Sequence, residues 1–136
     1  MAWVYQLTLI FSMFFALLGF SYNVWRMEVS EENSNIRTAC FEMLLELSSL
    51  EQLIYVAHYD QDDKTASPRI GWVKVALVAD LSVLTSDDIT KHSLILKKVW
   101  SQHWQLMLTD ENSVVKIVSA IEQVRVEIKQ TLHTLN

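Results

Sequence analysis

The sequence contains very few residues of the kinds that break helices or cross-link a chain. It has two glycines and one proline in 136 residues, and Cys40 is its single cysteine. A fold made of β-hairpins needs turn residues at regular intervals, so this scarcity argues against one and predicts an all-α protein. With one cysteine no disulfide can form within the chain, and we interpret Cys40 as a small buried hydrophobic residue.

Motifs of catalysis are also missing. There is no glycine-rich phosphate loop, no nucleophile motif and no pair of carboxylates in a recognisable catalytic context. No two of the four histidines stand three or four residues apart, which is the spacing that a helical metal site usually shows. We therefore expect no enzymatic activity, no metal site and no cofactor.

The charge balance limits the class of partner. Sixteen acidic and eleven basic residues give a net charge of −5 at pH 7. A nucleic-acid surface needs clustered Lys and Arg to neutralise phosphates, so the sequence argues against one. We expect the partners to be proteins.

The most prominent feature that the sequence does contain is a long apolar run at its amino end. From Trp3 to Val24 no side chain is charged, and 22 residues in a helix extend about 33 Å, enough for a hydrocarbon core of about 30 Å. Aromatic residues suited to membrane interfaces stand near both ends, Trp3 and Tyr5 at one and Tyr22 and Trp25 at the other. The run predicts a single transmembrane helix.

A cleavable signal peptide needs a basic start, a shorter apolar core and a small-residue cleavage site. Residues 1–29 have none of these, so we interpret this helix as an uncleaved signal anchor. The anchor and juxtamembrane segment are placed at residues 1–28 and a soluble domain at residues 29–136. Lys and Arg favour the cytoplasmic side, and Arg26 and Arg37 follow the span. We expect a single-pass membrane protein, in the inner membrane if the source is bacterial, with a cytoplasmic domain; a periplasmic or extracellular domain stays open.

One face of the span carries small residues. Ser12, Ala16 and Gly19 follow one another at spacings of four and three. Small side chains let transmembrane helices approach closely, so this face predicts contact with another transmembrane helix.

The clearest helix of the domain carries a heptad pattern. Its apolar residues recur at alternating steps of four and three: Ile36, Cys40, Met43, Leu47, Leu50, Ile54 and Ala57. Four further apolar residues widen this seam: Phe41, Leu44, Leu45 and Leu53. A stripe of that width favours the core of a bundle over a dimeric coiled coil. At its edge, Leu45, Val56 and Tyr59 are the first positions where we expect a partner surface.

Two further helices can be located from their boundaries. Ser67 followed by Pro68 predicts the start of the second helix, which ends near Leu84. Nearly every position from Val75 to Val83 is apolar, so we expect this helix to be buried on most sides. A third helix is predicted from Ile89 to Leu108, after the acidic residues that suit a helix start.

The fourth helix follows a polar turn and runs to the carboxyl end. Its apolar residues form one seam: Val114, Ile117, Ile121, Val124 and Ile128. Short connections between the second, third and fourth helices force antiparallel neighbours. The expected fold is all-α, with a single N-terminal transmembrane helix followed by an antiparallel, up-down-up-down four-helix bundle whose carboxyl end returns to the membrane-proximal end.

Asp80 is a carboxylate in an apolar stretch, and a buried carboxylate needs a partner. Arg125 on the fourth helix or Lys74 on the second could supply one. The favoured interpretation is a structural ion pair or a carboxylate at the surface of the domain. The alternative is a ligand-binding or proton-responsive acid inside the bundle.

Aromatic and imidazole side chains gather on the third helix at His92, Trp100, His103 and Trp104, and Trp72 on the second helix could face them. Packing within the core is the simplest interpretation. The alternatives are a cavity for an apolar ligand and an exposed tryptophan surface that docks a partner helix.

The sequence favours a non-enzymatic, membrane-anchored helical bundle that recruits or scaffolds another protein, as part of a membrane-associated complex. A second hypothesis is a small-molecule sensor that signals through a partner subunit. A third is an accessory subunit that stabilises a larger membrane complex through its transmembrane helix. Assembly into a homo-oligomer is compatible with each of them.

Overall fold

The computed structural model describes residues 1–62 and 64–135, which are helical and contain no strand. Its four α-helices are α1 (Ala2–Tyr55), α2 (Pro68–Ser82), α3 (Asp87–His103) and α4 (Glu111–Thr134). A π-helical turn, η1 (Val56–Asp60), continues α1, and a short 3₁₀ segment, η2 (Trp104–Leu106), follows α3. The expectation of an all-α chain is confirmed, and the expected transmembrane helix and first bundle helix are one continuous helix, α1.

The chain divides into two compact units, Met1–Ser34 and Asn35–Asn136. In the first unit every residue up to Val24 is exposed, and the apolar run makes the start of α1 long and apolar enough to cross a membrane by length and composition. Hydroxyl groups in this unit are bonded within the helix: Ser12 Oγ donates to the carbonyl oxygen of Thr8 at 2.8 Å.

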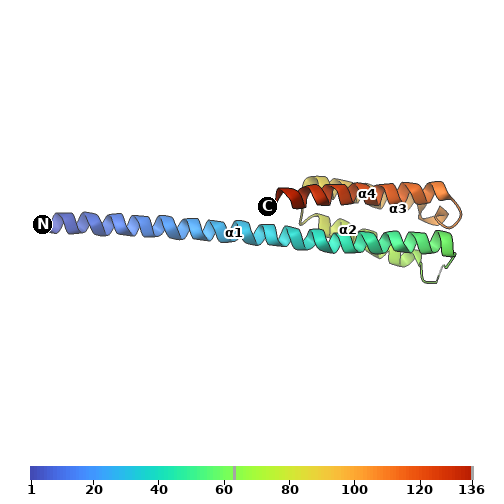
Figure 1. The fold of residues 1–136 in the computed structure, drawn as a ribbon, viewed down its shortest axis with the longest axis horizontal. Helices are drawn as coiled ribbons and strands as arrows, with labels where there is room; N and C mark the ends of the chain where they lie inside the picture. Colours follow the sequence, from blue (N-terminus) through green and yellow to red (C-terminus); the bar gives the residue numbers. More distant parts are fainter. Residues whose placement is uncertain (63, 136) are drawn as a thin grey trace. The chain divides into compact units, whose positions relative to one another are not determined.

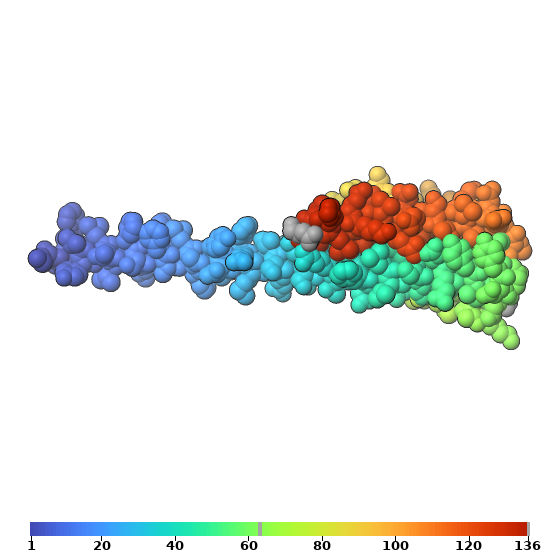
Figure 2. Space-filling view, viewed as in Figure 1, coloured from blue at the N-terminus to red at the C-terminus, as the bar shows by residue number. Residues whose placement is uncertain are grey.

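The second unit is an antiparallel bundle (Figure 1). An ion pair or a hydrogen bond links each helix to its neighbour in the bundle: Glu46 with Lys74, Ser82 with Thr90, His103 with Ser113, and Arg125 with Glu51. Figure 2 shows α1 and α4 side by side along one face of this unit. The bundle therefore closes in the order α1, α2, α3, α4.

The two seams that the sequence predicted lie in the core, together with buried residues of α2 and α3 that include Val75, Leu96 and Trp100. All five seam residues of α4 are buried, and the seam of the first bundle helix is buried except for Ile36, which packs against the core from its edge. Phe41 and Leu45 differ from the expectation for a wide core stripe, because they are 56% and 67% exposed. The core stripe of α1 is consequently narrower than expected.

The expectation that the second helix is buried on most sides is wrong. α2 buries one face, formed by Gly71, Val75, Val78, Ala79 and Ser82. Its opposite face is exposed and mostly apolar: Arg69, Ile70, Val73, Leu77 and Asp80. Val83 and Leu84, just past its end, are exposed as well. Among the described residues, none of the other helices covers this outer face of α2.

Polar side chains cap the amino-terminal ends of α3 and α4. Ser86 Oγ accepts a hydrogen bond from the backbone N–H of Ile89 at 3.3 Å, and Asp110 accepts bonds from the N–H groups of Asn112 and Ser113. Such caps satisfy backbone donors that the helix itself leaves unpaired. α3 ends at His103, before the Leu108 expected from sequence, because the chain tightens into η2 there.

The end of the bundle that holds η1 is fastened by two side chains. His58 Nδ1 donates to the carbonyl oxygen of Met107 at 2.8 Å. Gln61, whose backbone is left-handed at φ 54°, donates from Nε2 to the carbonyl oxygens of His58 and Leu108. These bonds tie the end of α1 to the connection that leads into α4.

At the opposite end of the bundle, the last turn of α4 lies beside the first bundle residues of α1. Arg37 donates from its guanidinium to the carbonyl oxygen of Leu135 at 2.6 Å. A cation at this position satisfies a carbonyl at the end of α4 and complements the negative end of the helix dipole. The carboxyl end of α4 therefore lies beside the start of the bundle portion of α1 (Figure 1).

Candidate functional site

Asp80 lies on the exposed outer face of α2 and forms no hydrogen bond or ion pair with a described residue. The idea of a buried acid paired to Arg125 or Lys74 is therefore wrong, and the alternative of a surface carboxylate is what the structure contains. The reason is rotation about the helix axis: Asp80 is flanked by buried Ala79 and half-buried Leu81, but its own side chain points outward.

The two cations expected near Asp80 are engaged on α1. Lys74 Nζ lies 3.1 Å from Glu46, and Arg125 lies 2.5 Å from Glu51 and 3.3 Å from Glu122. Burial disfavours the charge of Arg125, but the bonds and charges of Glu51 and Glu122 outweigh it and raise the pKa of the guanidinium. Arg125 is thus a structural link between α4 and α1.

Trp100 is fully buried against the backbone of α2. A Cβ added at Gly71 would stand 2.3 Å from Cζ2 of the indole, so the ring occupies the space that a side chain would need. Trp72 is half-buried and meets Trp100 edge to face, with ring centroids 6.4 Å apart and planes at 88°. This packing fills the region where the sequence suggested a ligand cavity.

Two buried polar atoms of α3 have no hydrogen-bond partner among the described residues: Trp100 Nε1 and Ser93 Oγ. The hollows described below are lined by neither residue. Trp100 and Ser93 therefore act in packing, at the cost of two unpaired polar groups.

His103 and Trp104 do not join the tryptophan pair. His103 Nδ1 donates to Ser113 Oγ at 3.1 Å, and that hydroxyl in turn donates to Asp110 at 2.7 Å. The bond from Ser113 is the main cause that lowers the pKa of Asp110. His103 is thus part of the polar network that starts α4, whereas Trp104 is half-buried against the core.

No group of three or more His, Cys, Asp or Glu side chains within residues 1–62 and 64–135 is arranged to hold a metal ion. Cys40 is buried, and burial raises the pKa of its thiol. A neutral thiol in an apolar core is unreactive. The geometry of the described residues therefore offers no nucleophile at this position.

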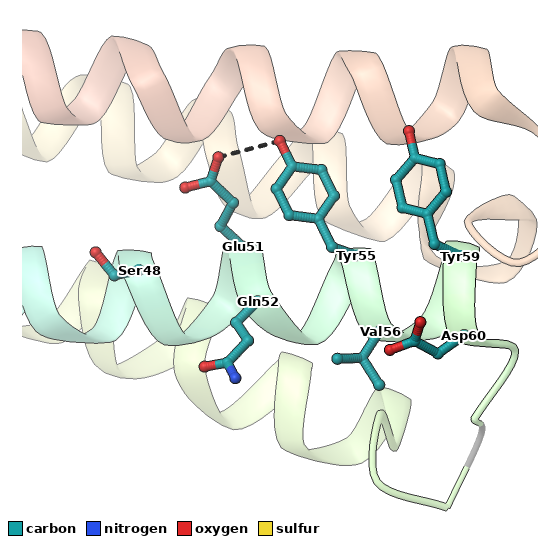
Figure 3. A pocket seen from close by; sticks show the side chains of 7 residues that line it. All are labelled: Ser48, Glu51, Gln52, Tyr55, Val56, Tyr59 and Asp60. Carbon is teal, nitrogen blue, oxygen red and sulfur yellow. Dashed lines mark hydrogen bonds between the residues drawn. The ribbon is translucent and has the colours of Figure 1, made fainter.

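A hollow of about 370 Å³ runs along the end of α1 and is shown in Figure 3. Glu51, Tyr55 and Tyr59 lie in a row on one side of the helix, and Gln52 and Val56 lie on the other. The tyrosine rings are 6.0 Å apart, and Tyr55 Oη donates to Glu51 at 3.2 Å.

The chemistry of this hollow is passive. Burial, with the nearby charge of Glu51, raises the pKa of Tyr55, so its phenol stays protonated at neutral pH. Glu51 is already engaged by Arg125 and by Tyr55. Leu45, Val56 and Tyr59 were expected at a partner surface, and Leu45 and Tyr59 are exposed, whereas Val56 is half-buried.

Two other hollows lie along α3. One of about 540 Å³ is lined by Asp87, Thr90, Lys91, Leu94, Ile95 and Lys98. The other, of about 510 Å³, lies between α3 and α4 and includes His103 and Val115 in its lining. Both combine exposed aliphatic side chains with lysines, and neither contains the carboxylate, histidine and nucleophile combinations of a catalytic centre.

The feature that the sequence argument missed is the outer face of α2. Its stripe residues Ile70, Val73, Leu77 and Asp80 follow one another at spacings of three and four, which is the heptad rule, and Leu84 continues this spacing just past the end of α2. The same spacing also describes the buried face, so α2 carries two seams and only one of them faces the core. Val73, near the middle of the outer stripe, is 66% exposed.

In the first unit, Ser12, Ala16 and Gly19 are exposed, and a Cβ added at Gly19 would meet nothing within 4 Å. This face has the small side chains that helix association needs.

Comparison of the chain with protein-family models, with curated proteins and with solved structures found no match in any of the three. Functional inference therefore depends on the geometry of this chain.

Proposed function

We propose that this chain is a non-enzymatic, single-pass membrane protein whose helical bundle binds a protein partner at the membrane through the outer face of α2. The observation that carries the proposal is that α2 is apolar on two opposite faces, one in the core and one exposed. A helix that is apolar all round is normally covered on all sides, and an exposed apolar face is a common mark of an interaction site.

Membrane anchoring is supported by the first unit. A soluble core helix with this hydropathy would be buried, whereas the apolar window of α1 has no buried residue. Exposed Leu, Ile and Phe side chains over this length are stable in lipid but not in water. Arg26 and Arg37, which follow the apolar run, favour a cytoplasmic bundle.

The sidedness can be measured with a single introduced thiol. Lys64 is exposed in the loop before α2, so Lys64→Cys presents a reactive thiol, while buried Cys40 stays inaccessible. Protection from a membrane-impermeant maleimide in intact cells, lost on lysis, supports a cytoplasmic bundle. Labelling in intact cells would place the bundle on the other side.

The two other hypotheses have less support. A sensor needs a cavity, and the packing of Trp100 on Gly71 fills the region around the tryptophans.

An accessory subunit would associate through Ser12, Ala16 and Gly19, so replacing all three with leucine would abolish its association. Association that survives this triple change would favour the bundle as the site of contact.

The central experiment is site-specific photo-crosslinking in cells. A photoreactive amino acid at Val73 should give an adduct, because Val73 lies in the proposed contact. The matched control carries the same group at Lys97, which is also exposed but lies on α3. No adduct at Val73 beyond that at Lys97 would refute the proposal.

A further inference from the structure

The outer face of α2 is complementary to itself, and we propose that its occupant is a second copy of this chain, packed with the two α2 helices antiparallel. This inference rests on the proposed function, because it names the partner of the same face. Its support is the pattern of apolar and charged residues on that face.

The apolar stripe repeats when α2 is turned end over end. A two-fold axis at the level of Val75 places Val73 of one copy opposite Leu77 of the other, and the reverse contact follows by symmetry. Ile70 then lies at the level of Asp80 of the second copy. The apolar contact of this register is therefore the pair Val73 and Leu77, made twice by symmetry.

The exposed charges of the face are also paired by this symmetry. Arg69 and Asp80 are exposed and make no ion pair with a described residue. They are eleven residues apart, about three helical turns, so they lie along the same edge of the stripe. In an antiparallel two-fold pair the same edges meet, which places Arg69 of each copy beside Asp80 of the other.

This arrangement explains why a second copy fits better than an unrelated helix. The chain carries a net charge of −5, so most of its surface repels another copy, but Arg69 and Asp80 make the outer face of α2 neutral. In a parallel two-fold pair opposite edges meet, so Arg69 and Asp80 of one copy would not face those of the other. The charges therefore select the antiparallel orientation as well as the partner.

The test uses the full-length protein in detergent micelles and charge reversal at the two positions. Arg69→Asp or Asp80→Arg alone should weaken self-association by about tenfold, because two attractive pairs become repulsive. The double variant restores both pairs in reversed order and should restore the dimer. Lys97→Glu on α3 is the control and should leave association unchanged.

The orientation is read by cross-linking. Chains with Val73→Cys and chains with Leu77→Cys should form a mixed disulfide when combined, whereas a parallel pair would join Val73→Cys to itself. Wild-type Cys40 is buried and should form none. A parallel product, or single reversals that leave the dimer intact, would overturn the inference.

The photo-crosslink at Val73 separates this inference from the proposed function. An adduct of twice the chain mass of 15.8 kDa supports the second copy. An adduct with a different protein overturns the second copy and leaves the proposed function standing. Absence of an adduct overturns both.

Discussion

The indole of Trp100 lies against Gly71 so closely that a methyl group on residue 71 would stand 2.3 Å from Cζ2. This contact sets the distance between α2 and α3. It also explains a glycine in the interior of a helix, where glycine ordinarily costs up to about 1 kcal/mol relative to alanine. The absence of a side chain is what lets a large ring fill the core.

Gly71→Ala should therefore destabilise the bundle, although alanine favours helix. Overpacking a core costs roughly 1–3 kcal/mol, which exceeds the gain in helix propensity. Thermal unfolding followed by circular dichroism in micelles measures the change. Gly19→Ala, where a Cβ meets nothing within 4 Å, is the control. Trp100→Leu in the Gly71→Ala background should remove the clash, and a purely additive double variant would contradict this explanation.

The link between α4 and α1 depends on Glu51 more than on Glu122. Glu51→Gln should cost roughly 1 kcal/mol, because the half-buried guanidinium of Arg125 loses its closer carboxylate. Glu122→Gln is the matched control and should cost less, since Glu122 is 51% exposed. Urea unfolding of both variants compares them. Equal losses would mean that the two carboxylates share the charge of Arg125.

Asp80→Ala should leave stability unchanged within about 0.5 kcal/mol, because the side chain is exposed and unpaired among the described residues. Leu47→Asp or Ile121→Asp should instead unfold the bundle, since each places a carboxylate in the core. Melting curves of the three variants provide the comparison. A folded Leu47→Asp protein would show that this position faces outward.

The charge of Asp110 should make the start of α4 sensitive to acid. The bond from Ser113 is the largest cause that lowers the pKa of Asp110, so the ionised form is bound more strongly in the folded protein. Its contribution is present above the ordinary carboxyl pKa of about 4 and is lost as pH falls through the lower folded value. Asp110→Asn keeps a capping oxygen without the charge. Its stability should be lower than wild type at pH 7 and converge with it in acid; a constant difference would argue against the charge.

The sequence predicted the helices and most of the core, because heptad spacing reports which side chains share a face. The seams through Leu47 and Ile121 are buried as expected. Spacing does not report which face turns inward when a helix carries two seams, and α2 is that case. The spacing of Val73 and Leu77 is as regular as that of Val75 and Val78.

The sequence also did not predict which side chains of different helices pair with one another. Arg125 meets Glu51 instead of Asp80 because the rotation of α2 directs Asp80 away from the bundle. Likewise, Trp100 was recognised as an aromatic core candidate, but its contact with Gly71 depends on the relative level of α2 and α3. Membrane crossing and the partner stay predictions until they are measured.

The bond between Arg37 and the carbonyl oxygen of Leu135 has a mechanical consequence. It joins the first bundle residues of α1 to the last turn of α4, so both chain ends of the bundle lie at one pole. A load pulling these ends apart would open the contact between α1 and α4 one turn at a time, as a zipper opens. A load applied between Arg37 and the start of α4 at Glu111, at the opposite pole, would strain the whole length of that contact at once. The direction of force, more than its size, would decide whether the bundle holds.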